Sequence, residues 1–253
     1  MGNRRNLHII MPMGGEGSRF KSVGIDTPKP LIKANGVSFF ERALRSISEC
    51  MGNRFKLTCI VRSEHVKQYH IDTEIQKVHP ANIITINKTT RGAVETVMLA
   101  KPYIEDDDAV LIMDCDLEFR AYDYIAAIMD SLYDISEYDG LLLSFKSTDP
   151  RYSYAAVDEN NIVTKTAEKI VISDNALIGS YFFSHGKLFK EVAQSMLDDA
   201  DKCLENVKEL YTSLLYNKYI DLGKKIKLYY KYTYNSFGTP EELKAYEENC
   251  NNN

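Results

Sequence analysis

Apolar residues in the first half of the chain come in short blocks, separated by stretches in which they recur at helical spacing. Short apolar blocks predict buried strands, and apolar residues every three or four positions predict helices with one buried face. The predicted strands are 7–11, 56–61, 83–86 and 110–113, and the predicted helices are 39–52, 63–70 and 92–100. This alternation predicts a parallel sheet covered by helices on both faces.

The pattern changes after residue 120. A predicted helix at 122–132 is followed by strand candidates at 140–145, 152–157, 162–165 and 177–183. Because these lie close together in sequence, we expect mixed or antiparallel pairing. Helices are predicted at 186–197 and 205–219, a strand at 226–232 and a terminal helix around 241–243. With no repeat and no long linker, residues 1–253 are expected to form one α/β domain, with a smaller extension of mixed strands.

Composition narrows the class of protein. The chain has 253 residues, 44% of them hydrophobic and 26% charged, which is ordinary for a globular protein. A formal net charge of −5 argues against a nucleic-acid partner. The five cysteines contain no C-x-x-C pair, so we expect reduced thiols and no zinc site. No apolar run approaches the ~20 residues of a membrane span, and we therefore expect a cytoplasmic protein with no membrane partner.

The first predicted strand runs into a glycine-rich loop. The loop consists of Met13, Gly14, Gly15, Glu16, Gly17, Ser18 and Arg19. Glycines let backbone N–H groups approach an anion closely. Arg19 adds a forked cation, and Lys29, between two prolines, adds a point charge. Together they would form a cradle for a triphosphate, although such a loop alone is often only a tight turn. Neither the G-x-G-x-x-G fingerprint nor the Walker pattern is present.

A second polar cluster follows the predicted strand at 110–113. Ligands of parallel α/β sheets lie beyond the carboxyl ends of the strands, which is where Asp114 and Asp116 fall. In an extended segment the two carboxylates point to the same face. Paired carboxylates suit Mg²⁺, which keeps several waters and binds substrate phosphates. The alternative is a helix-capping aspartate with a solvated neighbour.

The two motifs GGEGSR and PKPLI, in this order after a strand, resemble the signature of the sugar-phosphate nucleotidyltransferases. The matching residues are Gly15, Gly17, Ser18, Arg19, Pro28, Lys29, Pro30 and Leu31. The resemblance implies a Rossmann-like, mainly parallel sheet of the GT-A-like type. It also implies that residues 1–120 bind the nucleotide and residues 121–253 bind the acceptor. Arg19 and Lys29 would be catalytic, and Asp116 would bind magnesium.

Further segments resemble the same family. Arg91 and Gly92 look like part of its base-recognition turn, and a side chain that reads the base would fall near Asn87. Glu168 and Lys169 resemble its acceptor-site pair. Gly179 and Tyr181 resemble a strand of the acceptor site, and 238–241 resembles its C-terminal G-T-P-E. These matches extend the resemblance over nearly the whole chain.

The chain departs from the family at one position. The family usually has a second metal-binding aspartate two residues before the glycine of G-T-P, and this chain has Ser236 there. Either Asp114 supplies the second carboxylate or the site has only one.

The implied reaction joins the nucleoside monophosphate of an NTP to a small phosphorylated acceptor and releases pyrophosphate, with Mg²⁺ as cofactor. Within the family, GGEGSRF, MDCDLE and SFGTP look closest to capsule-pathway cytidylyltransferases. This resemblance implies CTP and L-glutamine phosphate as substrates. A sugar-1-phosphate nucleotidyltransferase is the close alternative. A D-x-D glycosyltransferase, a non-catalytic nucleotide-binding module and a homo-oligomer also stay open.

Overall fold

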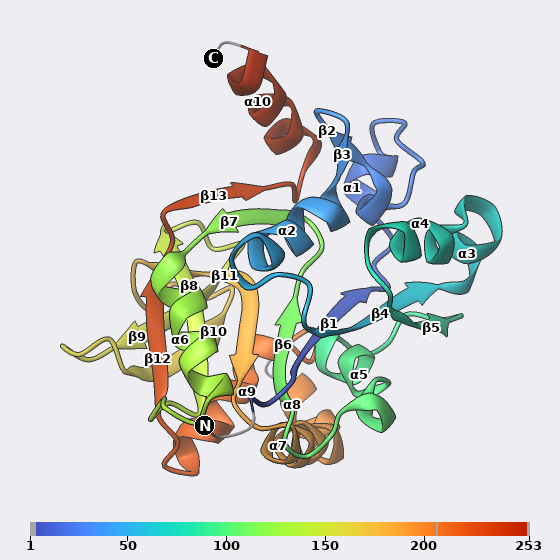
Figure 1. Cartoon of the computed structure of the whole chain (residues 1–253). Helices are drawn as coiled ribbons and strands as arrows, with labels where there is room; N and C mark the ends of the chain where they lie inside the picture. The colour runs from blue at the N-terminus through green and yellow to red at the C-terminus, as the bar shows by residue number, and fades with distance from the viewer. Residues whose placement is uncertain (1–3, 206, 252–253) are drawn as a thin grey trace.

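The computed structural model describes residues 4–205 and 207–251, which form a nine-stranded mixed sheet with helices on both faces (Figure 1). The strand order is β10-β9-β11-β6-β1-β4-β5, and β8 pairs with β11 and β12. This confirms the predicted fold class, a parallel core with a region of mixed strands beside it.

The first half of the chain forms the parallel core. Its strands are β1 (Leu7–Met13), β4 (Lys56–Arg62), β5 (Asn82–Ile86) and β6 (Ala109–Met113). β1 lies between β4 and β6, and all three run in the same direction. Almost every side chain of β1 and β6 is buried, because helices cover both faces of the sheet at its centre. The carboxyl ends of β1 and β6 therefore meet at one edge.

The second half of the chain adds strands of both directions. They are β8 (Gly140–Lys146), β9 (Ser153–Val157), β10 (Val163–Glu168), β11 (Asn175–Phe183) and β12 (Ile226–Tyr230). The long strand β11 joins the halves, since it pairs antiparallel with β6, β8 and β9. The sequence-based prediction of mixed pairing here is confirmed.

Two hydrophobic clusters, one on each face, hold the helices to the sheet. One contains buried residues of α2 (Phe39–Met51), α4 (Ile71–Val78) and α6 (Tyr122–Leu132). The other contains buried residues of α5 (Ala93–Met98), α7 (Gly186–Asp198) and α9 (Leu215–Asp221). Helix α2 illustrates the predicted start signal, because the Ser38 hydroxyl accepts a hydrogen bond from the Glu41 N–H. No helix of the described residues has the length and apolar character needed to span a membrane.

Several short elements were not predicted from the sequence. β7 (Leu117–Arg120) pairs antiparallel with β13 (Thr233–Ser236), and β2 (Lys33–Ala34) pairs with β3 (Val37–Ser38). Also not predicted were α1 (Ser18–Lys21), α8 (Ala200–Leu204) and three 3₁₀ turns, Lys29–Leu31, Lys101–Tyr103 and Thr212–Leu214. Helices α3 (Ser63–Tyr69) and α10 (Pro240–Asn251) were predicted and are present. The β7–β13 pair connects the segment after Asp116 to the chain just before α10 (Figure 1).

The predicted helix at 205–219 is confirmed over 215–219 and wrong before it, apart from residue 206, which lies outside the described residues. Residues 207–211 are not helical, and α9 begins only at Leu215. The reason is a tertiary contact: the Leu210 N–H donates to the Arg91 carbonyl, and the Val94 N–H donates to the Leu210 carbonyl. These bonds hold the segment against the loop before α5 and outweigh its helical pattern.

Candidate active site

The meeting of β1 and β6 brings the glycine loop and the acidic cluster together. The loop leaves β1 after Met13 and enters α1 through Gly17, while Asp114 follows β6 directly. The Asp114 N–H donates to the Gly179 carbonyl on β11 at 2.8 Å. Two cavities lie at this edge. Arg19, Asp114 and Asp116 line both of them, and we call this shared region the junction.

The first cavity, which we call the glycine-loop cavity, has a volume of about 310 Å³. Its walls are Pro12, Met13, Gly15, Gly17, Ser18, Arg19, Phe20, Lys29, Pro30, Asp114, Cys115, Asp116 and Gly238. Five of the seven residues of the predicted loop, both catalytic candidates and both metal candidates thus face one space. Gly14 and Glu16 are beside it: the Gly14 carbonyl accepts from Arg62, and Glu16 contacts Thr89.

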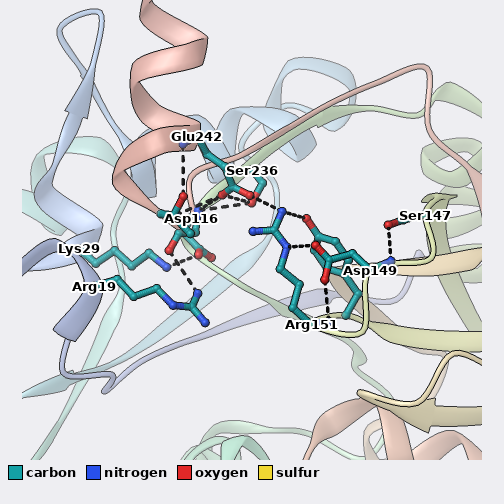
Figure 2. Close-up of polar contacts among 11 residues, drawn as sticks. Arg19, Lys29, Asp116, Ser147, Asp149, Arg151, Ser236 and Glu242 are labelled. Atoms are coloured by element: carbon teal, nitrogen blue, oxygen red, sulfur yellow. Dashed lines mark hydrogen bonds and ion pairs between the residues drawn. The ribbon is translucent and has the colours of Figure 1, made fainter.

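Lys29 and Asp116 form an ion pair at the junction of the cavities (Figure 2). Burial lowers the pKa of Lys29, but the Asp116 carboxylate outweighs this effect and holds the pKa above its ordinary value. Nearby, an Arg19 Nη1–H donates to the Gly238 carbonyl at 3.4 Å. The cavity therefore carries two cations for an anionic ligand, one of them already neutralised by a carboxylate.

Asp114 is packed against β11 at a glycine. A Cβ at position 179 would lie 2.0 Å from an Asp114 carboxylate oxygen, so only glycine leaves room for this side chain. Burial, and then repulsion from the Asp116 carboxylate, raise the pKa of Asp114. The two carboxylates offer hard oxygen ligands that suit Mg²⁺. Among residues 4–205 and 207–251 no group of three or more His, Cys, Asp or Glu side chains is placed to hold a metal, so a metal here would take its other ligands from substrate and water.

The second cavity, which we call the tyrosine-lined cavity, has a volume of about 300 Å³. Tyr152, Tyr181, Tyr211 and Tyr234 give it its name, and its other walls include Ser153, Glu168, Gly179, Ser213, Arg151, Ser236 and Glu242. Glu168 accepts hydrogen bonds from the hydroxyls of Ser153 and Ser213. Burial outweighs these bonds and raises the pKa of Glu168. Three acceptor-site candidates, Glu168, Gly179 and Tyr181, are thus brought together.

Lys169 is placed differently from its neighbour Glu168. Its ammonium donates to the Tyr211 hydroxyl at 2.9 Å, and it lies 4.9 Å from the centre of the same ring. This hydrogen bond raises the pKa of Lys169. The side chain therefore contacts Tyr211, a residue of the cavity wall, and the described residues that line the cavity do not include Lys169 itself.

The candidate base-recognition residues lie beside the glycine loop but outside the described walls of both cavities. Asn87 follows β5 and is exposed. Arg91 is paired with Glu95. Gly92, at φ +147°, packs so closely that a Cβ there would lie 2.3 Å from the Leu210 nitrogen, which fixes the turn against the segment before α9.

A polar network that the sequence did not reveal borders the tyrosine-lined cavity (Figure 2). The Arg151 guanidinium pairs with Glu242 at 2.7 Å and, through Nε, with Asp149 at 3.1 Å. Glu242 also accepts from the Ser236 hydroxyl at 2.8 Å and from the Gly238 N–H at 2.7 Å. Arg151 and Glu242 are 91 positions apart and share no motif. The sequence indicates only that Thr239 and Glu242 have the spacing of a capping box at a helix start.

Comparison with known proteins places this geometry in context. The sequence model of the family described as nucleotidyl transferase matches residues 7–230. No curated protein sequence matches the chain.

Solved structures share the fold. A nucleoside-diphosphate-sugar pyrophosphorylase from Vibrio cholerae RC9 superposes with a TM-score of 0.78 at 23% identity, covering 95% of this chain and 99% of its own. An inositol-1-phosphate CTP transferase from T. maritima gives 0.69 at 18% identity, covering 97% and 96%. HddC from Yersinia pseudotuberculosis gives 0.67 at 20% identity, covering 96% and 99%.

Proposed function

Since this chain belongs to the nucleotidyl transferase family, we propose that it transfers a nucleoside monophosphate from an NTP to a small phosphorylated acceptor, with release of pyrophosphate. The observation that carries the proposal is the pair of cavities that meet at Asp114 and Asp116. One is bordered by the glycine loop and suits a triphosphate. The other has room for a small acceptor whose phosphate would point to the junction.

The nucleophile is an oxygen of the acceptor phosphate. A second phosphate pKa near 6 leaves it ionised at neutral pH, so no general base is needed. A bond forms between this oxygen and the α-phosphorus, the bond from the α-phosphorus to the bridging oxygen breaks, and pyrophosphate leaves with that electron pair. Catalysis then consists of aligning two anions and offsetting their charge.

Residues of the glycine-loop cavity would both align the triphosphate and offset its charge. Backbone N–H groups of the loop and the Arg19 guanidinium hold the β- and γ-phosphates as they become the leaving group. Lys29 lies at the junction, where negative charge grows at the α-phosphate in the transition state. We assign Met13 to Ser18, with Asn87, Arg91 and Gly92, to nucleotide binding, in line with a division into a nucleotide half (1–120) and an acceptor half (121–253).

Mg²⁺ fits the residues at the junction. Asp116 and Asp114 would hold it through carboxylate oxygens, and when bound it would offset the charge of the triphosphate. The Lys29 ammonium now neutralises Asp116. Once a nucleotide enters, Lys29 can turn from the carboxylate to the phosphate.

For the substrates, we propose CTP and, as acceptor, L-glutamine phosphate, in a cytoplasmic step of capsule or surface polysaccharide synthesis. The resemblance of the glycine loop and the C-terminal segment supports this assignment. Glu168, Gly179 and Tyr181 would contact the acceptor in the cavity, and Lys169 would act on it through Tyr211. A sugar 1-phosphate is the second candidate acceptor, because the similar structure from Vibrio cholerae is described as a sugar pyrophosphorylase.

A pyrophosphate-release screen tests the function. CTP, UTP, ATP and GTP are each incubated with Mg²⁺ and a panel that contains L-glutamine phosphate, glucose 1-phosphate and inositol 1-phosphate. We expect pyrophosphate with CTP and L-glutamine phosphate, and none with an Asp116→Ala variant. Free nucleoside diphosphate in place of pyrophosphate would indicate a glycosyltransferase, and nucleotide binding without turnover would indicate a binding module.

A further inference from the structure

The tyrosine-lined cavity has an unusual balance of charge for a site that must receive a phosphate. Its walls include four carboxylates, Asp114, Asp116, Glu168 and Glu242. The described cations among its walls are Arg19 and Arg151. Arg19 also lines the glycine-loop cavity and contacts the Gly238 carbonyl. Arg151 is thus the cation on the acceptor side.

The Arg151 guanidinium is held in place before any ligand arrives. It lies over the Tyr152 ring at 4.7 Å from the ring centre, and its Nε pairs with Asp149. The Asp149 carboxylate in turn accepts from the Arg151 N–H at 3.0 Å, and the Asp149 N–H donates to the Ser147 hydroxyl (Figure 2). A stacked and anchored guanidinium loses little freedom when it binds an anion.

Glu242 meets this guanidinium with one carboxylate oxygen only. Its other oxygen accepts from the Ser236 hydroxyl and from the backbone N–H groups of Gly238 and Thr239. The Thr239 hydroxyl accepts from the Glu242 N–H, which completes a capping box at the start of α10. Glu242 therefore keeps its place and three donors even when the contact with Arg151 is broken.

We propose that Arg151 binds the phosphate of the acceptor, and that Glu242 is an internal anion that occupies the guanidinium until the acceptor arrives. A phosphate offers paired oxygens to the planar fork, whereas Glu242 offers one. Glu242 is next to the junction, since the Gly238 Cβ position lies 3.1 Å from its carboxylate and 4.0 Å from that of Asp116. An anion that replaces Glu242 at Arg151 would therefore lie in the cavity that Asp116 also lines. This inference rests on the proposed function.

Two variants separate this role from a merely structural ion pair. Arg151→Gln removes the cation and should weaken phosphate binding. Glu242→Gln should strengthen it, because the amide oxygen can still accept from Ser236 and the backbone while the amide NH₂ gives Arg151 no acceptor. If the pair only fastened the Arg151 loop to α10, both variants would change binding in the same direction.

The probe is inorganic phosphate, titrated calorimetrically into the full-length protein saturated with Mg²⁺ and α,β-methylene-CTP, so that the glycine loop is filled. We expect at least a tenfold loss of affinity in Arg151→Gln, an intermediate loss in Arg151→Lys and a roughly threefold to tenfold gain in Glu242→Gln, the scale of one charge-assisted contact. Lys190→Gln is the control, because Lys190 is also a cation paired with a carboxylate, Asp106, and it lines neither cavity. Its affinity should match that of the wild type.

Parallel kinetics with an accepted substrate should show the acceptor KM of Arg151→Gln raised at least tenfold and the NTP KM unchanged within twofold. Loss of affinity in both Arg151→Gln and Glu242→Gln, or wild-type affinity in Arg151→Gln, would overturn the proposal. Failure of the pyrophosphate screen would instead remove the proposed function. The same phosphate titration of the wild type, Arg151→Gln and Glu242→Gln without nucleotide would then still test Arg151.

Discussion

The clearest structural prediction concerns Ser236, where most of the family has a metal-binding aspartate. Sequence resemblance suggests that Ser236→Asp would repair the metal site. The structure predicts that it destabilises the protein, because the Ser236 hydroxyl donates to Glu242 at 2.8 Å. An aspartate has no proton to donate, so two carboxylates would face one another.

The size of the effect follows from this contact. Loss of a hydrogen bond to a charged group costs about 1.5–3 kcal/mol. Two like charges about 3 Å apart, at an effective dielectric of about 20, would add at most about 5 kcal/mol. Arg151 and the partial exposure of Glu242 (19%) relieve part of this repulsion. We expect a net loss of about 2–3 kcal/mol of unfolding free energy, or a fall in Tm of about 5–10 °C for a domain of this size.

Thermal unfolding followed by circular dichroism at pH 8 and pH 5 measures the effect. In the Ser236→Asp variant, repulsion between the new carboxylate and Glu242 raises the pKa of this carboxyl pair in the folded state above its unfolded value. The folded state therefore binds more protons, and the loss of stability relative to the wild type becomes smaller as the pH falls. Ser236→Asn is the isosteric uncharged control and should lose less than about 1 kcal/mol. The double variant Ser236→Asp/Glu242→Gln should recover most of the lost stability. A Ser236→Asp protein as stable as Ser236→Asn at pH 8 would refute the reasoning.

Three further predictions concern the junction and the base turn. Lys29→Ala should lower kcat by on the order of 10²-fold with a smaller change in NTP affinity, since its contact strengthens in the transition state; single-turnover rates and calorimetry check this, and an unchanged kcat would make Lys29 a structural residue. Asp116→Ala should nearly abolish turnover, whereas Asp114→Ala should mainly raise the Mg²⁺ concentration for half-maximal rate; a metal titration that gives the same curve for Asp114→Ala and wild type would contradict the second half. Gly92→Ala should lower Tm by several degrees, because its Cβ would lie 2.3 Å from the Leu210 nitrogen; a wild-type melting curve would show that the turn can move.

The sequence predicted the core of the fold well because its signals are local. The strand after Asn6 and the helix capped by Ser38 each carry their own local pattern. Each of them begins within one residue of its predicted start. The short β7–β13 pair has only four residues on each side. Such strands depend on a partner over 100 positions away, so no local period reveals them.

The site was predictable where it is built from contiguous motifs. Arg19, Lys29 and Asp116 belong to such motifs, and the structure brings them to one cavity. Arg151 and Glu242 meet only through tertiary folding. Lys169, grouped with Glu168 by resemblance, instead contacts Tyr211 and does not line the cavity itself. Its αL backbone, at φ 56°, turns it away from the line of β10, and a sequence pattern does not specify that turn.

The segment around Leu210 joins the loop before α5 to a wall of the tyrosine-lined cavity. Its backbone bonds to Arg91 and Val94, and three residues later the Ser213 hydroxyl donates to Glu168 in the cavity wall. A one-residue insertion between these contacts would shift the loop before α5 and this cavity wall out of register together. In the proposed function the first binds the nucleotide and the second binds the acceptor. We therefore expect substrate specificity for the two ligands to change jointly in chains whose lengths differ here, and inserted tags to be tolerated at the exposed turn around Asn160 but not at this segment.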